Sequence, residues 1–170
     1  MHELAITVIG PDRTGIIADV AEALAGVGAN LADSTMTRLR GHFAMTLICT
    51  GPGAEAVEKA LAPLTADGRL LATVRSVQPE ADAAATGEPF LVSVHGADRL
   101  GIVAAVSRVV AAVGGNITDL TTRLTGPLYV IVAEVDLDPA RAEQLAEQLA
   151  VAAAELGVDV TMRRAESEIL

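Results

Sequence analysis

A ten-residue stretch near the start of the chain, VIGPDRTGII from Val8, returns 86 positions later as VHGADRLGIV from Val94. Aligned without gaps, residues 8–33 and 94–119 agree at 13 of 26 positions. The shared residues of the first copy are Val8, Gly10, Asp12, Arg13, Gly15, Ile16, Ala18, Val20, Ala25, Val27, Gly28, Asn30 and Asp33. This period is too long for a solenoid repeat and suits a small domain. The sequence therefore predicts one fold that is present twice.

The repeat divides the 170 residues into two predicted domains, 1–78 and 89–165, with a linker at 79–88 and a tail at 166–170. Domains of this size fold alone, but with a small margin of stability. Hydrophobic residues make up 51% of the chain and aromatic residues only 2%, so aliphatic side chains must form most of each core. The composition is that of a globular protein.

The chain is acidic, with a formal net charge of −10. Proteins that bind phosphate backbones need a clustered basic face, and the short pairs Arg38/Arg40 and Arg163/Arg164 do not supply one. We therefore expect no direct binding to nucleic acid or to acidic membranes. The single Cys49 permits no internal disulfide, and the sequence shows neither a membrane span nor a signal peptide. The predicted location is the cytoplasm.

Apolar periodicity predicts the order strand, helix, strand, strand, helix, strand in each half. The first helix has Ile16, Val20 and Leu24 on one face. Asp12 or Thr14 is its expected N-cap. The predicted strands of the first half are Leu4–Ile9, Leu31–Leu39, Phe43–Thr50 and Arg69–Val77. Those of the second half are Phe90–His95, Ile117–Leu124, Leu128–Val135 and Val158–Arg163.

This order predicts an α+β fold: two ferredoxin-like βαββαβ domains, each an antiparallel four-stranded sheet with both helices on one face. The last helix of the chain has Asp138 as its expected N-cap, Pro139 at its first position and Gly157 beyond its end. The strand Leu128–Val135 is apolar on both faces apart from Tyr129 and Glu134. We therefore expect its second face to be covered by the other half or by a second chain.

The repeated Asp-Arg-x-Gly-Ile segment stands between the first strand and the first helix of each half. A helix N-terminus offers unsatisfied N–H groups and a partial positive charge, which suit a carboxylate. The glycine leaves the approach open, and an asparagine at the start of the next strand supplies a donor and an acceptor. Together these features predict an amino-acid site. The candidate residues are Asp12, Arg13, Gly15, Ile16 and Asn30, with Asp98, Arg99, Gly101, Ile102 and Asn116.

The same residues also have a structural interpretation. The aspartates could cap helices, the glycines could permit close packing of strand and helix, and each asparagine could form a turn. Gene duplication preserves structural residues as well as functional ones. The two interpretations therefore both stay open at this point.

The segment Pro-Asp-Arg-x-Gly-Ile-Ile, followed about fifteen residues later by Asn-Leu-x-Asp, resembles the ACT domain. ACT domains are ferredoxin-like modules that commonly bind amino acids and regulate enzymes. A chain that consists of two ACT domains and almost nothing else resembles the glycine cleavage system transcriptional repressor group. The resemblance implies ligand sites in the clefts where ACT domains pair, near Asp12, Gly15, Asn30 and their counterparts. Other members, such as formyltetrahydrofolate deformylase, attach the module to a catalytic domain for which this sequence has no room.

The second copy departs from the ACT pattern. Ala97 stands in place of the proline, and Leu100 stands in place of a small or polar residue. The two sites are therefore expected to differ in affinity, or only one of them to work. His95, whose counterpart is Ile9, could contact a ligand in the second site alone.

No set of titratable residues has a catalytic spacing. His2, His42 and His95 fall at a terminus, a hairpin turn and a strand end, without metal-ligand spacing. Cys49 lies in an apolar strand with no histidine near it in sequence, which favours an inert core thiol. We expect no enzyme, no cofactor and no metal.

The sequence thus predicts a non-catalytic cytoplasmic regulator that binds a small amino acid, with glycine and serine as first candidates, and acts through a protein partner. The resemblance implies a role in control of glycine cleavage gene expression. ACT pairing is expected within the chain or in a homo-oligomer. One alternative is an interaction or dimerisation module that binds no ligand, and another is an enzyme whose site the sequence does not show.

Overall fold

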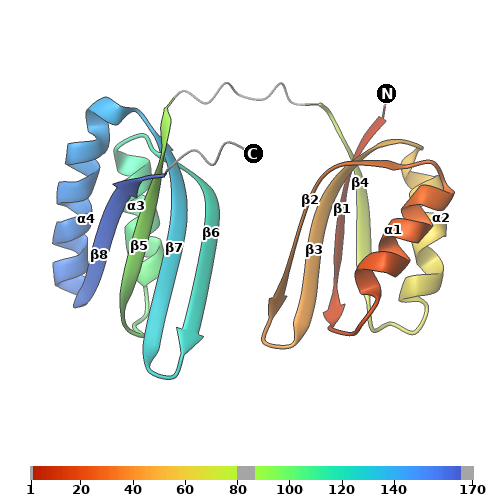
Figure 1. Cartoon of the computed structure of the whole chain (residues 1–170), viewed down its shortest axis with the longest axis horizontal. Helices are drawn as coiled ribbons and strands as arrows, with labels where there is room; N and C mark the ends of the chain where they lie inside the picture. Colours follow the sequence, from red (N-terminus) through yellow and green to blue (C-terminus); the bar gives the residue numbers. More distant parts are fainter. Residues whose placement is uncertain (1, 80–86, 166–170) are drawn as a thin grey trace. The chain divides into compact units, whose positions relative to one another are not determined.

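The computed structural model describes residues 2–79 and 87–165. Contacts divide the chain into two units, Met1–Ala81 and Asp82–Leu170, which we call unit 1 and unit 2. Residues 80–86, which hold most of the predicted linker, lie outside the described residues, as does the predicted tail at 166–170. Each unit has the predicted order βαββαβ (Figure 1).

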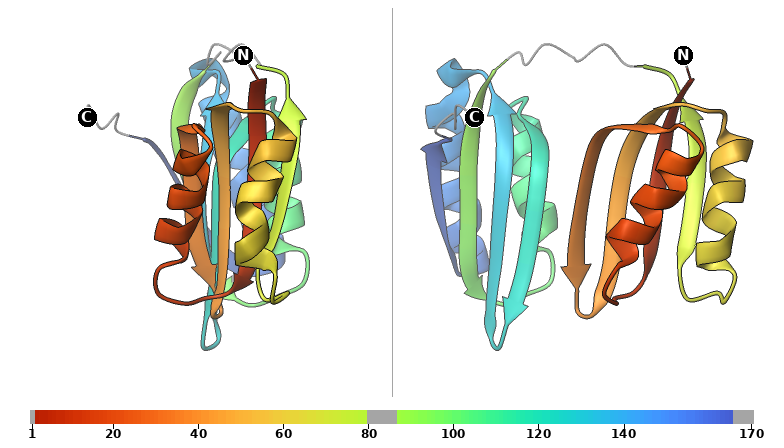
Figure 2. Two further views of the ribbon diagram at one scale, coloured as in Figure 1. Left: turned by 90° about the vertical axis from the view of Figure 1, so that its right-hand side faces the viewer. Right: turned by 45° about the vertical axis from the view of Figure 1, so that its right-hand side comes forward.

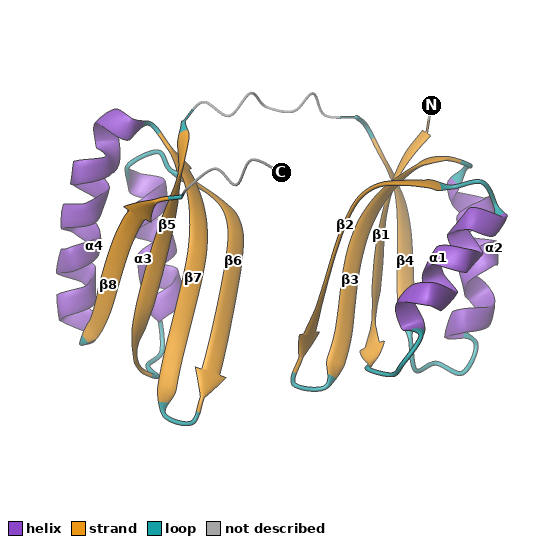
Figure 3. Ribbon diagram, in the orientation of Figure 1, coloured by secondary structure: helices purple, strands orange, loops and turns teal. Residues whose placement is uncertain are grey.

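The elements of unit 1 are β1 (His2–Pro11), α1 (Ile16–Gly26), β2 (Asn30–Leu39), β3 (His42–Gly51), α2 (Ala54–Thr65) and β4 (Leu71–Val77). Those of unit 2 are β5 (Glu88–Ala97), α3 (Ile102–Ala112), β6 (Asn116–Thr125), β7 (Leu128–Leu137), a 3₁₀ turn η1 (Pro139–Arg141), α4 (Ala142–Leu156) and β8 (Val158–Arg164). The antiparallel sheets have the orders β2-β3-β1-β4 and β6-β7-β5-β8. Both helices of a unit cover the same face of its sheet (Figures 2 and 3). The predicted α+β fold is confirmed.

Each core forms where two helices pack on alternate residues of the central strands. In unit 1, β3 buries Phe43, Met45, Leu47 and Cys49 on one face, as its period-two pattern predicts. The helix face of Ile16, Val20 and Leu24 is also buried. In unit 2 the same arrangement is built from valine, leucine, isoleucine and alanine around Phe90, with the partly buried Tyr129 packed against it. The expectation of aliphatic cores is confirmed.

The first strand of each unit is longer than the sequence predicts. β1 continues through Gly10 to Pro11, which pairs with His42, although the Gly-Pro dipeptide indicates a turn. A proline is tolerated here because it is the last residue of the strand. Gly10 itself has no room for a side chain, since a Cβ atom would overlap the backbone carbonyl of Arg69. This repeated glycine lets β4 begin close against β1.

The two β-hairpins close with two-residue turns of different type. Arg40 and Gly41 both have positive φ, 49° and 82°, as in a type I′ turn. In unit 2 only Gly126 has positive φ, 60°, and Pro127 follows it, as in a type II′ turn. Both turns match the right-handed twist of the strands that they join. His42, expected in the turn, belongs to β3.

The start of the last helix region is as predicted, with one refinement. The Asp138 carboxylate accepts a hydrogen bond from the Ala140 N–H at 2.9 Å, and Gly157 ends α4 at φ 67°. Between them Pro139 begins the short 3₁₀ turn η1, and the α-helix follows from Ala142. No helix of the described part of the chain is long and apolar enough to cross a membrane.

Candidate functional site

The repeated Asp-Arg-x-Gly-Ile segments form the loops that precede α1 and α3. Gly15 and Gly101 have φ values of 88° and 90°, in the left-handed region that side chains disfavour. A Cβ atom at Gly15 would find its nearest neighbour, the Arg13 guanidinium, at 3.8 Å, and one at Gly101 would find nothing within 4 Å. These two glycines are therefore required by backbone conformation and not by close packing of strand and helix.

Both helices begin without a side-chain cap. The Gly15 carbonyl accepts the first helical hydrogen bond from the Asp19 N–H at 2.9 Å, and the Gly101 carbonyl accepts one from Ala105 at the same distance. No side chain accepts from the first-turn N–H groups of α1 or α3. The prediction that Asp12 or Thr14 caps α1 is wrong, because Gly15 takes the N-cap position. The first-turn N–H groups therefore have no side-chain acceptor in these loops and can pair with water or with an anion.

Two ion pairs hold the loop of unit 1. The Arg13 Nη2 lies 2.7 Å from the Asp19 Oδ2, and its Nη1 donates to the Thr14 carbonyl at 3.1 Å. The Arg38 Nη1 lies 3.6 Å from the Asp12 Oδ2. These partly exposed pairs contribute little stability, roughly 0–1 kcal/mol each. Their importance lies in the local charge. The Asp19 carboxylate, which is held by Arg13, lies in the first turn of α1 and compensates the partial positive charge there.

The loop of unit 2 has the same backbone but neither ion pair. The counterpart of Asp19 is Ala105, and the counterpart of Arg38 is Leu124. Among residues 2–79 and 87–165, Asp98 and Arg99 have no ion-pair or side-chain hydrogen-bond partner. The first turn of α3 contains no acidic residue. The helix N-terminus of unit 2 is therefore not compensated by a carboxylate of its own.

Each loop borders a hollow that is lined by four of the five candidate residues of its unit. In unit 1 it has a volume of about 140 Å³ and is lined by Asp12, Arg13, Gly15, Ile16, Ile17, Ala18, Met36 and Phe43. In unit 2 it has a volume of about 380 Å³ and is lined by Asp98, Arg99, Leu100, Gly101, Ile102, Val103, Ala104 and Tyr129. Tyr129 replaces Phe43 and adds a phenol to the lining of the second hollow.

The fifth candidate residue of each unit lies elsewhere. Asn30 begins β2 opposite Thr50, whose partner on β1 is Glu3, whereas the loop follows the far end of β1. The helix α1, 11 residues or about 16 Å long, separates the two ends. Asn116 stands in the same place in unit 2. Within one unit, the structure therefore does not bring the asparagine to the Asp-Arg-x-Gly-Ile loop.

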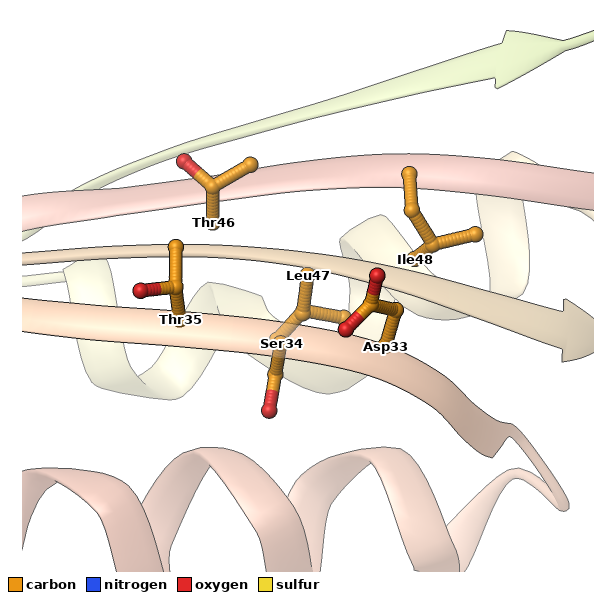
Figure 4. Close-up of a pocket in the computed structure, with 6 residues that line it drawn as sticks. All are labelled: Asp33, Ser34, Thr35, Thr46, Leu47 and Ile48. Carbon is orange, nitrogen blue, oxygen red and sulfur yellow. The ribbon is translucent and has the colours of Figure 1, made fainter. Parts of the chain in front are cut away.

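The repeated Asn-x-x-Asp instead marks a β-bulge at the start of β2 and β6. The register shifts between Leu31 and Asp33 in unit 1 and between Ile117 and Asp119 in unit 2. A bulge re-aims the side chains that follow it. In unit 1 a hollow of about 160 Å³ adjoins the bulge, lined by Asp33, Ser34, Thr35, Thr46, Leu47 and Ile48 (Figure 4). Our sequence reasoning missed this hollow, although the repeated aspartate was a signal for it.

The remaining candidates from the sequence stand apart from the loops. His95 is not part of the lining of the unit 2 hollow, and its Nε2 lies 3.6 Å from the Asp159 Oδ2 on the neighbouring strand β8. Burial raises the pKa of the Cys49 thiol, which disfavours the reactive thiolate. In the described ranges, no three or more His, Cys, Asp or Glu side chains are grouped to hold a metal ion.

Both units match the family model of the ACT domain, over residues 2–77 and 88–163. The chain belongs to the ACT domain family. Two archaeal relatives are each matched over 75 residues, which cover 43% of this chain and 83% of the relative. They are UPF0237 proteins of Methanopyrus kandleri, 43% identical, and of Methanocaldococcus jannaschii, 37% identical. Each relative therefore corresponds to one ACT domain of the present pair.

Two solved structures share the tandem arrangement over nearly the whole chain. An unknown protein from Galdieria sulphuraria has a TM-score of 0.79 and 26% identity, covering 97% of this chain and 99% of that protein. A protein provisionally named a glycine cleavage system transcriptional repressor has a TM-score of 0.76 and 21% identity, covering 98% of both chains. At that identity the second likeness shows the fold alone. The chain is thus a tandem ACT-domain protein.

Proposed function

We propose that this protein is a non-catalytic regulator that binds a small amino acid at its ACT domains and acts through a protein partner. The observation that supports this most is the pair of helix N-termini without a side-chain cap, each preceded by an aspartate and an arginine. The first-turn N–H groups would hold the ligand carboxylate. The ligand ammonium would take an aspartate, Asp12 or Asp98, or a backbone carbonyl. Glycine and serine are the first candidates.

Unit 2 is the stronger of the two proposed sites. Its hollow is the larger, and no carboxylate of the first turn of α3 competes with that of a ligand. Arg99 has no ion-pair partner in the described residues, whereas Arg13 is held by Asp19. An anion that binds at α3 therefore gains an uncompensated helix N-terminus and a free guanidinium.

The proposed partner is a protein and not a nucleic acid, because a net charge of −10 opposes phosphate binding. The provisional name of the repressor that shares the tandem fold motivates a role in glycine cleavage gene expression. Such a role would be carried out by modulating another regulator. The free, buried Cys49 fits a reducing compartment, and we propose the cytoplasm.

Calorimetric titration of the full chain with glycine, serine and the other small amino acids tests the proposal. A ligand that binds only the native state stabilises it by about 2.7 kcal/mol at 100 times its Kd, so a thermal-shift screen should detect it as well. Binding of one amino acid with a raised Tm is the expected result. A folded protein that responds to none of the amino acids would contradict amino-acid sensing.

Matched arginine variants locate the site. Arg99→Gln should weaken binding, and Arg13→Gln should change it less because Asp19 already neutralises that guanidinium. Asn30→Ala and Asn116→Ala form a second matched pair. A ligand held inside one unit cannot reach both the loop and the asparagine. Lost affinity in both an arginine variant and an asparagine variant would therefore show that the site is not confined to one unit, whereas loss in an asparagine variant alone would place the ligand away from the loop.

A ligand-independent interaction module is the second candidate function. The observation that favours it is the exposed apolar side chains on the helix-free face of the unit 1 sheet, among them Leu71 at 63% and Ile9 at 45% exposure. Self-association or partner binding that is unchanged by every amino acid would support this function over sensing.

A further inference from the structure

The face of the unit 1 sheet that α1 and α2 leave uncovered is ordered in rows. Strand register places Thr35 opposite Thr46, Thr46 opposite Thr7, and Thr7 opposite Thr73. A row of four threonines therefore crosses all four strands, and the hydroxyls of Thr7 and Thr46 are 3.5 Å apart. In Figure 4, Thr35 and Thr46 point away from the helices, whereas Ser34 points toward them.

Two further rows flank the threonines. The row nearer the Asp-Arg-x-Gly-Ile loop consists of Thr37, Ala44, Ile9 and Leu71, and the row on the other side consists of Asp33, Ile48, Ala5 and Arg75. These three rows of four residues contain two charged side chains, Asp33 on β2 and Arg75 on β4. The two stand at opposite ends of the same row. Three strand spacings separate them, about 14 Å, so they cannot pair within one sheet.

Neither charge is compensated inside the unit. Within residues 2–79 and 87–165, Asp33 and Arg75 have no ion pair and no side-chain hydrogen bond. The rows between and beside them hold threonine, alanine and isoleucine, which form a nearly uncharged surface suited to sheet-on-sheet packing. A fourth row of the same face, next to that of Asp33, consists of Asn30, Thr50, Glu3 and Val77 and adds the Glu3 carboxylate. Apart from Glu3, the surface carries an acid at one edge and a base at the other, with apolar and hydroxyl groups between.

We propose that this face docks on the same face of a second copy of the chain, about a two-fold axis that runs parallel to the strands. Such a rotation keeps each row at its own level and reverses the order of the strands. β2 then lies over the partner's β4, and β3 lies over the partner's β1. The contact is isologous, so every pairing occurs twice.

This one rotation matches charge and size in all three rows. Asp33 meets the partner's Arg75, and Arg75 meets the partner's Asp33. Ala44 lies over the partner's Ile9, and Ala5 lies over the partner's Ile48, so that a small residue opposes a large one each time. Threonines oppose threonines, whose hydroxyls can both donate and accept. Aligned sheets cross at about 30°, and the length of the arginine side chain accommodates the resulting offset at the edges.

The corresponding face of unit 2 is a poorer candidate for self-docking. It keeps the acid and the base, with Asp119 and Arg163 at the ends of the equivalent row. The interior of that row, however, has Glu134 in place of Ile48, and the same rotation would place this carboxylate over the partner's Leu91. The match of small to large residues is therefore a property of unit 1.

The area of the contact is modest. Four strands of about eight residues offer roughly 500 Å² of flat surface per copy. Two copies together reach the ~1,000 Å² at which specific interfaces begin. We expect a dimer that forms at micromolar concentration and dissociates on dilution.

Charge reversal tests the register of the dimer in the full chain. Sedimentation velocity should show concentration-dependent dimers of the natural protein, and at least ten-fold weaker association for Asp33→Arg or Arg75→Asp alone. One of these variants has a base at both positions and the other an acid at both, so an equimolar mixture should restore dimers. Glu58→Arg, on the exposed face of α2, is the control for equal charge change and should dimerise normally.

Cysteine cross-linking tests the same register independently. In the double variant Asp33→Cys/Arg75→Cys, each thiol lies opposite the other position of the partner, across the roughly 10 Å that separate packed sheets. That gap is too wide for a direct disulfide, which requires Cα atoms within about 7 Å. A short bismaleimide that spans this gap should give a covalent two-chain species on a denaturing gel. Asp33→Cys or Arg75→Cys alone should give none, because each edge position is far from its own symmetry mate.

Three results would overturn the proposal. They are a natural protein that stays monomeric at hundreds of micromolar, a mixture of the two charge variants that associates no better than either one, or a double-cysteine variant that does not cross-link between chains. Circular dichroism establishes that each variant is folded, which is expected since both positions are exposed. No amino acid is present in these measurements, so their failure would leave the proposed sensing function untouched.

Discussion

The loops that precede α1 and α3 have the same motif and the same backbone, yet they differ in their charges. Gly15 and Gly101 agree in φ to within a few degrees. The carboxylate in the first turn is present in unit 1 as Asp19 and absent in unit 2, where Ala105 replaces it. The motif determines the conformation, and residues outside the motif determine whether the helix N-terminus is already compensated.

The largest expected effect is a loss of stability on replacing a strand glycine of the repeat by alanine. We expect this loss to differ between the two copies, Gly10 and Gly96. A Cβ at Gly10 would overlap the backbone of Arg69, which cannot move without shifting β4. At Gly96 the nearest atom is a methyl group of the Val158 side chain, at 2.8 Å. We expect Gly10→Ala to lower the free energy of unfolding of unit 1 by about 3 kcal/mol. Gly96→Ala should lower that of unit 2 by roughly 1 kcal/mol.

Urea unfolding of the two variants measures this difference. Equal losses would mean that the start of β8 is held as firmly as the start of β4. Because the chain has two units, the unfolding of each must be followed by a probe in that unit, and a single global fit does not apply.

The second prediction concerns the similarity of the loops. Gly15→Ala and Gly101→Ala each place a Cβ in the left-handed region without a steric contact, so strain is their only cost. We expect the two losses of stability to be equal, about 1–2 kcal/mol each. Thermal unfolding by calorimetry provides the measurement. A much smaller loss at Gly101 would show that the loop of unit 2 adopts another conformation at low cost.

The third prediction exchanges the charge that distinguishes the loops. Ala105→Asp should weaken the binding of an amino-acid carboxylate at α3 about three-fold, because a helix N-terminus favours an anion by roughly 0.3–1 kcal/mol. Asp19→Ala should strengthen binding at α1 by a similar factor. Titration calorimetry at low salt measures both. Unchanged affinity in both variants would place the ligand away from the helix N-termini.

The fold could be predicted almost completely from the sequence, because strand and helix periods act locally. The repeat gave the duplication, and the spacing of Ile16, Val20 and Leu24 gave the buried face of α1. The errors arose where a residue occupies a position that its type does not usually indicate. Pro11 ends a strand and forms no turn, and Gly15 displaces Asp12 as the N-cap.

The candidate site was predictable only in part. Asp-Arg-x-Gly-Ile is contiguous, so its five residues had to lie together. Asn30 follows a helix that runs antiparallel to β1, and this returns the chain to the opposite end of the sheet. The bond between Arg13 and Asp19, which distinguishes unit 1 from unit 2, joins residues on either side of the glycine turn. A pattern of residue types does not reveal which charges such a turn brings into contact.

The smallest expected effect concerns the core of unit 1, where Cys49 has Val135 as its counterpart. Burial raises the pKa of the native thiol above that of the unfolded chain, about 8.5. The thiol contribution to stability is therefore complete below that value and decreases as the pH rises through it toward the native pKa. Stability of unit 1 should decline slightly above pH 8.5, and Cys49→Val should remove this slope while unit 2 keeps its own pH profile. Urea unfolding between pH 7 and 10, with a probe in each unit, measures it, and a slope that persists in Cys49→Val would assign the pH dependence to another group.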